Sequence, residues 1–238
     1  MVSEAAERRD GRQATTLRQL HLQSASLSRA DGSASWRQEG TEVLAAVFGP
    51  TEAPGRREDP ERLVVEVLFR PRAGLVGRSD RESEYVIRRT LETVLLKAMH
   101  PRTVVQVVLQ IVSDDGSLLS AALNAACFAL VDAGVPMSGL FSSVTCALLP
   151  ESVLVVDPTK EEEEAATATV CLALENHPQG AASAQSAEPS RIITSHTRGT
   201  ISKEAYSDVV MFCRKGRDLI EDFARSSLKK QHGGADAQ

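Results

Sequence analysis

Six arginines gather in one stretch of the chain, with a spacing that favours contact with phosphate groups. Four fall within twelve residues of a glycine-containing loop and two follow on a predicted helix: Arg70, Arg72, Arg78, Arg81, Arg88 and Arg89. A guanidinium presents a planar fork of donors that suits phosphate oxygens. Two other roles stay open for these side chains: ion pairs with Asp80, Glu82 and Glu84, or contact with a neighbouring subunit.

A run of four glutamates, residues 161–164, is the second group with chemical potential. Carboxylate oxygens are ligands that Mg²⁺ prefers, so a metal site is one interpretation of the run. A solvated loop is the other interpretation, and it is the usual structure of such a charge run. We therefore expect a loop here, with no resident metal or cofactor.

The overall charge argues against a nucleic-acid binder that acts through bulk positive charge. The chain has 27 lysines and arginines against 32 aspartates and glutamates, a formal net charge of −5. A local basic cluster is still compatible with binding. The sequence has no apolar run of about 18 residues and no apolar core of a secretory signal near its N-terminus, so we expect neither a membrane span nor a signal peptide.

Four cysteines lie far apart and form no CxxC pair: Cys127, Cys146, Cys171 and Cys213. This spacing disfavours a zinc site or a redox motif. Three of the four have strongly apolar neighbours, so we expect buried, reduced thiols in a cytosolic or nuclear protein.

The apolar pattern predicts a β-rich α/β arrangement that would position these groups. Strands are expected near residues 17–22, 33–38, 41–48, 63–69, 104–112, 142–149, 153–156, 168–174 and 192–196. We expect Gly49-Pro50 to end the third strand. The fifth strand is expected to be buried on both faces, or nearly so. Three helices are expected: one with residues 87–98 on its apolar face that ends at His100-Pro101, a central one over 118–131 that is apolar all round, and one capped by Ser202.

The composition also predicts the limits of the folded part. Residues 1–16 are expected to form a disordered tail, and residues 229–238 a polar tail. Between them we expect a single domain over residues 17–228, with a low-complexity surface insertion at 176–190.

Three blocks of the sequence, in order, resemble the RNase PH family in its eukaryotic RNA exosome branch. The blocks are residues 29–50 (beginning RADGSA), 115–137 (beginning DGSLLSAALNAA) and 155–163 (VVDPTKEEE). The resemblance implies the RNase PH fold, an α/β (α+β) arrangement of the ribosomal protein S5 domain 2-like type. In that fold, mixed sheets and packed helices form two βαβα-like halves, and six such domains form a ring around a channel for RNA.

The resemblance also implies that the catalytic residues of active relatives are mostly lost. Where those enzymes place a Gly-Thr-Arg sequence to hold phosphate at the start of the central helix, this chain has Ser117, Leu118 and Leu119. Leucine neither donates a hydrogen bond nor neutralises phosphate, and losing one comparable donor costs about 3–4 kcal/mol of transition-state stabilisation elsewhere. An ungapped alignment puts Glu161 and Thr167 at the positions of two aspartates, so one acid is retained and one is lost.

The function implied is that of a non-catalytic ring subunit that supports 3′-to-5′ RNA processing and degradation, including ribosomal RNA maturation, RNA surveillance and mRNA turnover. Its implied partners are other RNase PH-like subunits, cap subunits, recruited nucleases and single-stranded RNA, without a membrane. The implied locations are nucleus, nucleolus and cytoplasm. The isolated chain is expected to form a homodimer or to aggregate.

Two alternatives to this function stay open. The first is an active homo-oligomeric nuclease, phosphorolytic with inorganic phosphate or hydrolytic with Mg²⁺, which would need Glu161 and its neighbours to hold the metal. The second is a protein-interaction scaffold with no RNA contact.

Overall fold

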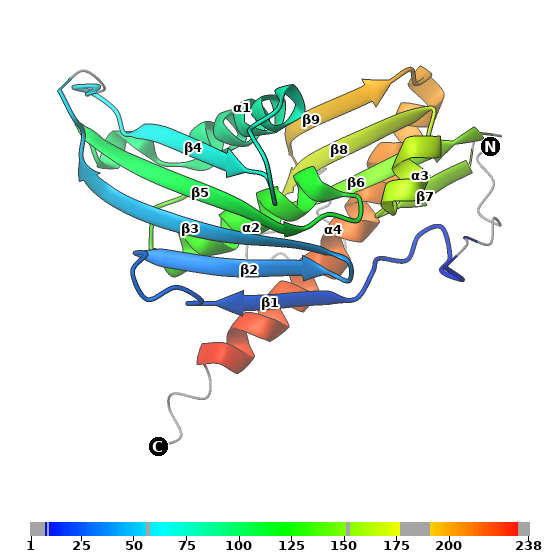
Figure 1. The fold of residues 1–238 in the computed structure, drawn as a ribbon, viewed down its shortest axis with the longest axis horizontal. Helices are drawn as coiled ribbons and strands as arrows, with labels where there is room; N and C mark the ends of the chain where they lie inside the picture. Colours follow the sequence, from blue (N-terminus) through cyan, green and yellow to red (C-terminus); the bar gives the residue numbers. More distant parts are fainter. Residues whose placement is uncertain (1–7, 9, 56–57, 151–152, 177–190, 233–238) are drawn as a thin grey trace, which may run out of the picture. The chain divides into compact units, whose positions relative to one another are not determined.

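The chain divides into two units, which are described separately. The computed structural model describes Arg8 and residues 10–55, 58–150, 153–176 and 191–232 (Figure 1). Unit 1 consists of Met1–Leu20, Asp115–Ser120 and Phe141–Gln238, and unit 2 of His21–Asp114 and Ala121–Leu140. The expected insertion at 176–190 lies, apart from Asn176, outside the described residues.

Unit 2 contains a five-stranded sheet in the order β1-β2-β3-β5-β4. The strands are β1 (Leu20–Ser24), β2 (Gly32–Gln38), β3 (Thr41–Glu52), β4 (Val64–Arg70) and β5 (Thr103–Ser113). β3 lies antiparallel to β2 and β5, whereas β4 runs parallel to β5. Parallel neighbours need a crossover connection, and helix α1 (Arg78–Val94) with the short 3₁₀ turn η1 (Lys97–Met99) supplies it.

The core of unit 2 forms where the sheet meets helix α2 (Leu118–Asp132). Residues 121–130 of α2 are all buried, which confirms the predicted central helix. The Trp36 ring of β2 stacks on Phe128 with a centroid separation of 5.4 Å. Gly32 allows the close approach of β2 and α2, because a Cβ there would lie 2.2 Å from the backbone nitrogen of Ala133.

Unit 1 contains a four-stranded sheet in the order β7-β6-β8-β9, with neighbouring strands antiparallel. Helix α4 packs on β6, β7 and β8, and Ser202 caps it as predicted by accepting the Ala205 amide at 3.2 Å. The elements are β6 (Phe141–Leu149), β7 (Val153–Val156), α3 (Lys160–Ala165), β8 (Ala168–Glu175), β9 (Ile192–Gly199) and α4 (Lys203–His232).

Three predicted features of unit 2 are wrong. β3 continues past Gly49-Pro50 to Glu52, because a register shift between Phe48 and Thr51 takes the proline out of the regular ladder. Helix α1 ends at Val94 after 17 residues, and residues 97–99 form a separate 3₁₀ turn. β5 is buried on one face only, since Val108 on its other face is half-buried and Val112 is exposed.

The folded part of the chain extends further toward both termini than the sequence predicted. Arg8 and Ala14 are buried in unit 1, and the Val156 amide donates to the Ala14 carbonyl at 2.8 Å, so these two residues anchor a segment whose other described residues are partly or fully exposed. At the other end, α4 extends past residue 228 to His232. Residues 1–7, 9 and 233–238 lie outside the described residues.

Burial of the thiols has a consequence at high pH. All four cysteines are buried and free, and burial raises the pKa of Cys171 to about 11 from its ordinary 9.0. Above pH 9 the unfolded chain loses this proton and the folded chain keeps it, so the free energy of unfolding falls between about pH 9 and 11. The slope per thiol is at most ~1.4 kcal/mol per pH unit. Urea titrations across this range should show a shallower decline for Cys171→Ser than for the parent, and equal slopes would contradict the assignment.

Candidate functional site

The opening of helix α2 is held by a tight turn that faces helix α3. Gly116 has a φ of +85°, and a Cβ there would lie 2.6 Å from three backbone atoms of residues 158–160. Ser117 follows with a φ of +54°, and its hydroxyl donates to the Pro158 carbonyl at 3.1 Å. The turn therefore presses the start of α2 directly against the segment that leads into α3.

A carboxylate of the chain itself accepts the amide at this opening. The Ser117 amide donates to Oε1 of Glu163 at 2.8 Å. Backbone amides at the start of a helix attract anions, and here Glu163 provides the anion. An incoming phosphate would have to displace that carboxylate and would be repelled by its charge.

The four glutamates form a short helix, so the loop predicted for residues 161–164 is wrong. Thr159 accepts the Glu162 amide, and the Glu162 carboxylate accepts the Thr159 amide at 2.9 Å, which makes a capping box. Acids in the first turn are favoured by the helix dipole. The helical turn points Glu163 at Ser117, whereas Glu161 is exposed on α3 and lines a neighbouring pocket.

A buried ion pair fixes the turn before α2. Arg18 and Asp157 have side chains that are 0% and 2% exposed, with Nη2 of Arg18 2.7 Å from Oδ1 of Asp157. Arg18 also donates from Nε to Oδ2 of Asp157 at 3.0 Å. The same guanidinium donates to the carbonyls of Asp115 and Gly116 at 2.7 and 3.2 Å. One arginine thus ties the end of β7 to the loop that opens α2.

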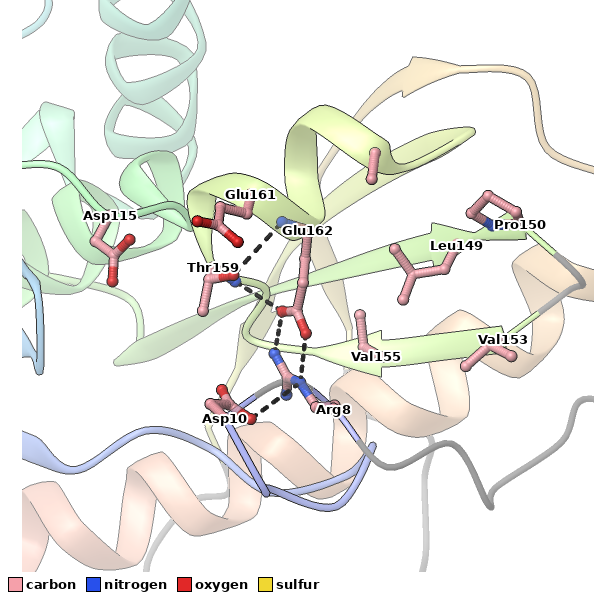
Figure 2. A pocket seen from close by; sticks show the side chains of 11 residues that line it. Arg8, Asp10, Asp115, Leu149, Pro150, Val153, Val155, Thr159, Glu161 and Glu162 are labelled. Atoms are coloured by element: carbon pink, nitrogen blue, oxygen red, sulfur yellow. Dashed lines mark hydrogen bonds and ion pairs between the residues drawn. The ribbon is translucent and has the colours of Figure 1, made fainter.

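A second arginine, Arg8, contacts the first turn of α3 through Glu162 (Figure 2). Its guanidinium donates to both carboxylate oxygens of Glu162 and to the carbonyls of Val156 and Asp157. Burial by itself would raise the pKa of Glu162, but the hydrogen bonds from Arg8 and the Thr159 amide outweigh it and hold that pKa below its ordinary value. Arg8 is therefore committed to protein contacts.

The pocket of about 600 Å³ beside Arg8 is apolar on one wall and acidic at its rim (Figure 2). The apolar wall comes from β6, β7 and the end of α3. The acidic rim includes Asp10, Asp115 and Glu161. Since its lining carries four carboxylates against the single guanidinium of Arg8, the pocket does not favour a phosphate backbone.

The two positions aligned with catalytic aspartates do not meet at the opening of α2. Glu161 lines the acidic pocket, and Thr167 is exposed before β8 with its amide donating to the Leu148 carbonyl at 2.8 Å. The half-buried Leu118 and Leu119 are the first two residues of α2. Glu163, which the sequence analysis did not single out, is the glutamate of the run that contacts this opening.

The six arginines all belong to unit 2 and divide into two sets. Arg70, at the end of β4, and Arg72, Arg78 and Arg81, on the following loop and first turn of α1, are exposed. Arg88 lies over the Tyr85 ring at 5.6 Å, and Arg89 pairs with Glu92 at 3.1 Å. Those two guanidiniums therefore already have partners on their own helix.

Over the described ranges, no group of three or more His, Cys, Asp or Glu side chains could hold a metal ion. Over the same ranges, no helix has both the length and the apolarity needed to cross a membrane.

The fold is shared with proteins of one family over nearly the whole chain. A curated protein of Arabidopsis thaliana, "Exosome complex exonuclease RRP46 homolog", is 38% identical over 236 residues, covering 96% of this chain and 98% of that protein. A rice protein of the same name is 37% identical over 235 residues, with 95% and 98% covered. The crystal structure of rice Rrp46 matches with a TM-score of 0.85 and 36% identity, covering 93% of this chain and all of that one.

The two sheets, with α2 buried all round and opening on a glycine turn, define a protein of the RNase PH fold. Residues 16–136 match the model of the 3′ exoribonuclease family, domain 1. With the identities above, this match shows that the chain belongs to the RNase PH (3′ exoribonuclease) family. The fold expected from the sequence is thereby confirmed.

Proposed function

We propose that this chain is a non-catalytic RNase PH-type ring subunit of a eukaryotic RNA exosome, of the kind called RRP46 or exosome component five. Its identity to two plant proteins named as exosome RRP46 homologues, over almost their full length, supports the assignment to that complex. In this role the chain would support 3′-to-5′ RNA processing and degradation in the nucleus, nucleolus and cytoplasm. It would do so beside other RNase PH-like subunits, cap subunits and recruited nucleases.

The contact between the Ser117 amide and the Glu163 carboxylate is the observation that carries the non-catalytic part of the proposal. Phosphorolysis needs an anion site for inorganic phosphate at the start of the central helix. In this chain a carboxylate takes the amide at that position, and leucines follow it. The guanidinium that contacts this opening, that of Arg18, is buried and already paired with Asp157.

An active nuclease is the second candidate, because the plant relatives are named exonucleases. A 3′-end degradation assay on single-stranded RNA, with Mg²⁺ and with or without inorganic phosphate, separates the two candidates. We expect no nucleoside diphosphates or monophosphates to be released by the purified chain. Phosphate-dependent release of diphosphates that is lost in both Glu161→Ala and Glu163→Gln would favour the active enzyme instead.

We further propose that the exposed arginines of the β4–α1 loop contact RNA phosphates, with Arg88 and Arg89 at the margin of this surface. Replacing Arg72, Arg78 and Arg81 together by glutamine should weaken filter retention of single-stranded RNA. The slope of log affinity against log salt should become shallower by about 2, given ~0.7 per phosphate contact. Arg37→Gln, an exposed arginine of β2, is the matched control and should leave the slope unchanged.

Retention that is the same in the triple glutamine variant as in the parent would count against RNA contact at this loop. That result would favour the scaffold alternative, in which the arginines serve subunit contacts.

A further inference from the structure

The pocket of about 600 Å³ in unit 1 has an apolar wall that the chain leaves partly uncovered. Ala14, Ala147 and Val155 form a small buried cluster, and Leu149 and Val153 pack against it without being fully buried. In Figure 2 these two side chains lie on the same side of the pocket as Val155. Removing such apolar surface from water is favourable, so the wall has a driving force to bind an apolar group.

The acidic rim of the same pocket faces solvent, whereas the guanidiniums beside it are buried. Asp10 and Asp115 have side chains that are 33% and 49% exposed, and Glu161 is also exposed. The neighbouring side chains of Arg8 and Arg18 are 1% and 0% exposed. A ligand that approaches from solvent therefore meets carboxylates before it meets guanidiniums.

The combination of an apolar wall and an acidic rim selects the kind of ligand. Carboxylates at the rim attract cations and repel the phosphates of RNA. The volume lies within the range of about 300–1,000 Å³ that is typical of ligand pockets, so there is room for more than one side chain. A protein segment presents aliphatic side chains and lysines or arginines within a few residues of each other. Such a segment can meet both parts of the pocket at once.

We propose that this pocket binds a segment of a partner protein in which aliphatic side chains are flanked by lysines or arginines. An aliphatic side chain packs on Leu149 and Val153, and the cations face the acidic rim. Exposed ion pairs each contribute little free energy, so the apolar contact supplies most of the affinity and the rim supplies selectivity. The site depends neither on the RNA contact nor on the ring membership proposed above, so its test is independent of theirs.

The direct probe is a fluorescent, capped ten-residue peptide with two central leucines, lysines on both sides of them and serines elsewhere. The full-length chain should bind it saturably in an anisotropy titration, and a peptide with glutamates in place of the lysines should bind at least tenfold more weakly. Glu161→Lys should weaken binding of the lysine peptide by about tenfold. Glu204→Lys is the matched control and should bind as the parent does, because both glutamates are exposed and follow the lysine that begins a helix.

The apolar wall has a test of its own. Val153→Thr keeps the β-branched shape but places a hydroxyl on the wall, and it should weaken binding by about threefold with an unchanged circular dichroism spectrum. Replacing both leucines of the peptide by serine should weaken binding by at least tenfold.

Four results would overturn the proposal. The first is no saturable binding up to millimolar peptide, or equal binding of the peptides with leucine and with serine. Equal weakening by Glu161→Lys and Glu204→Lys would show attraction to net charge instead of a defined site. Displacement of the peptide by single-stranded RNA would assign the pocket to RNA. Self-association of the chain that the peptide inhibits and Glu161→Lys abolishes would assign it to a second copy, in which Leu75 is 96% exposed between Arg72 and Arg78.

Discussion

Replacing Arg18 with methionine is expected to lower the free energy of unfolding by about 3–5 kcal/mol, because it leaves Asp157 buried without its main counterion. The substitution keeps most of the aliphatic volume, so the loss reports the guanidinium. That group makes contacts with the carboxylate of Asp157 and with two carbonyls, all in unit 1. Arg12 stays near but cannot replace it, since its Nη1 lies 3.9 Å from the Asp157 carboxylate.

Urea titration followed by circular dichroism measures this effect, with Arg37→Met as an exposed-arginine control. Arg18→Lys should recover only part of the loss, because one ammonium cannot reproduce the planar fork of donors. A second change, Asp157→Asn in the Arg18→Met background, removes the unpaired buried charge and should restore some of the free energy of unfolding. A loss below about 1 kcal/mol for Arg18→Met would mean that the pair contributes no more than an exposed ion pair does.

Gly116→Ala is expected to destabilise unit 1 strongly, because both the backbone conformation and the space at Gly116 exclude a side chain. The positive φ of Gly116 costs a non-glycine residue about 1–3 kcal/mol. The new Cβ would also meet the backbone of residues 158–160 at 2.6 Å, which no side-chain rotation relieves. Overpacking adds about 1–3 kcal/mol, so we expect a total loss of roughly 2–6 kcal/mol.

Gly134→Ala measures the backbone part of this effect alone, so that the steric part can be obtained by difference. Gly134 has a φ of +66°, but a Cβ there has nothing within 4 Å, so only the backbone cost applies. The difference between the two variants in urea titrations is the cost of pushing the α2 turn away from α3. Hydrogen exchange at the Ser117 amide should accelerate in Gly116→Ala alone, since its bond to Glu163 is displaced. Equal losses in the two variants would contradict the close approach.

Periodicity was sufficient to predict most elements of the fold, but not the details that depend on distant partners. The apolar runs of β4 and α2 are local signals, and both elements formed within one residue of the predicted bounds. The capping box of Thr159 and Glu162 was also a local signal, and it was overlooked because a run of four glutamates resembles a solvated loop. The capping box predicts the start of α3, and a helix there places Glu163 on a different face from Glu161.

The ion pairs that build the site could not be predicted from the sequence near them. Arg8 lies in the segment predicted to be a tail and Arg18 in the predicted first strand, and their partners Glu162 and Asp157 are more than 130 residues away. Burial of those arginines depends on the tertiary fold, which brings Asp157 and Glu162 to them. The resemblance to the family located the region of the site, and only the contacts distinguished Glu163 from Glu161.

The arrangement of unit 1 along the chain sets an order for folding during synthesis. The sequence of unit 2 is nearly continuous and is complete once Leu140 has been made, whereas unit 1 needs both the first twenty residues and the last part of the chain. Arg18 is translated 139 residues before Asp157, a delay on the order of ten seconds at typical elongation rates. We therefore expect the segment around Arg18 to dock only after Asp157 has been made, later than the core of unit 2 forms.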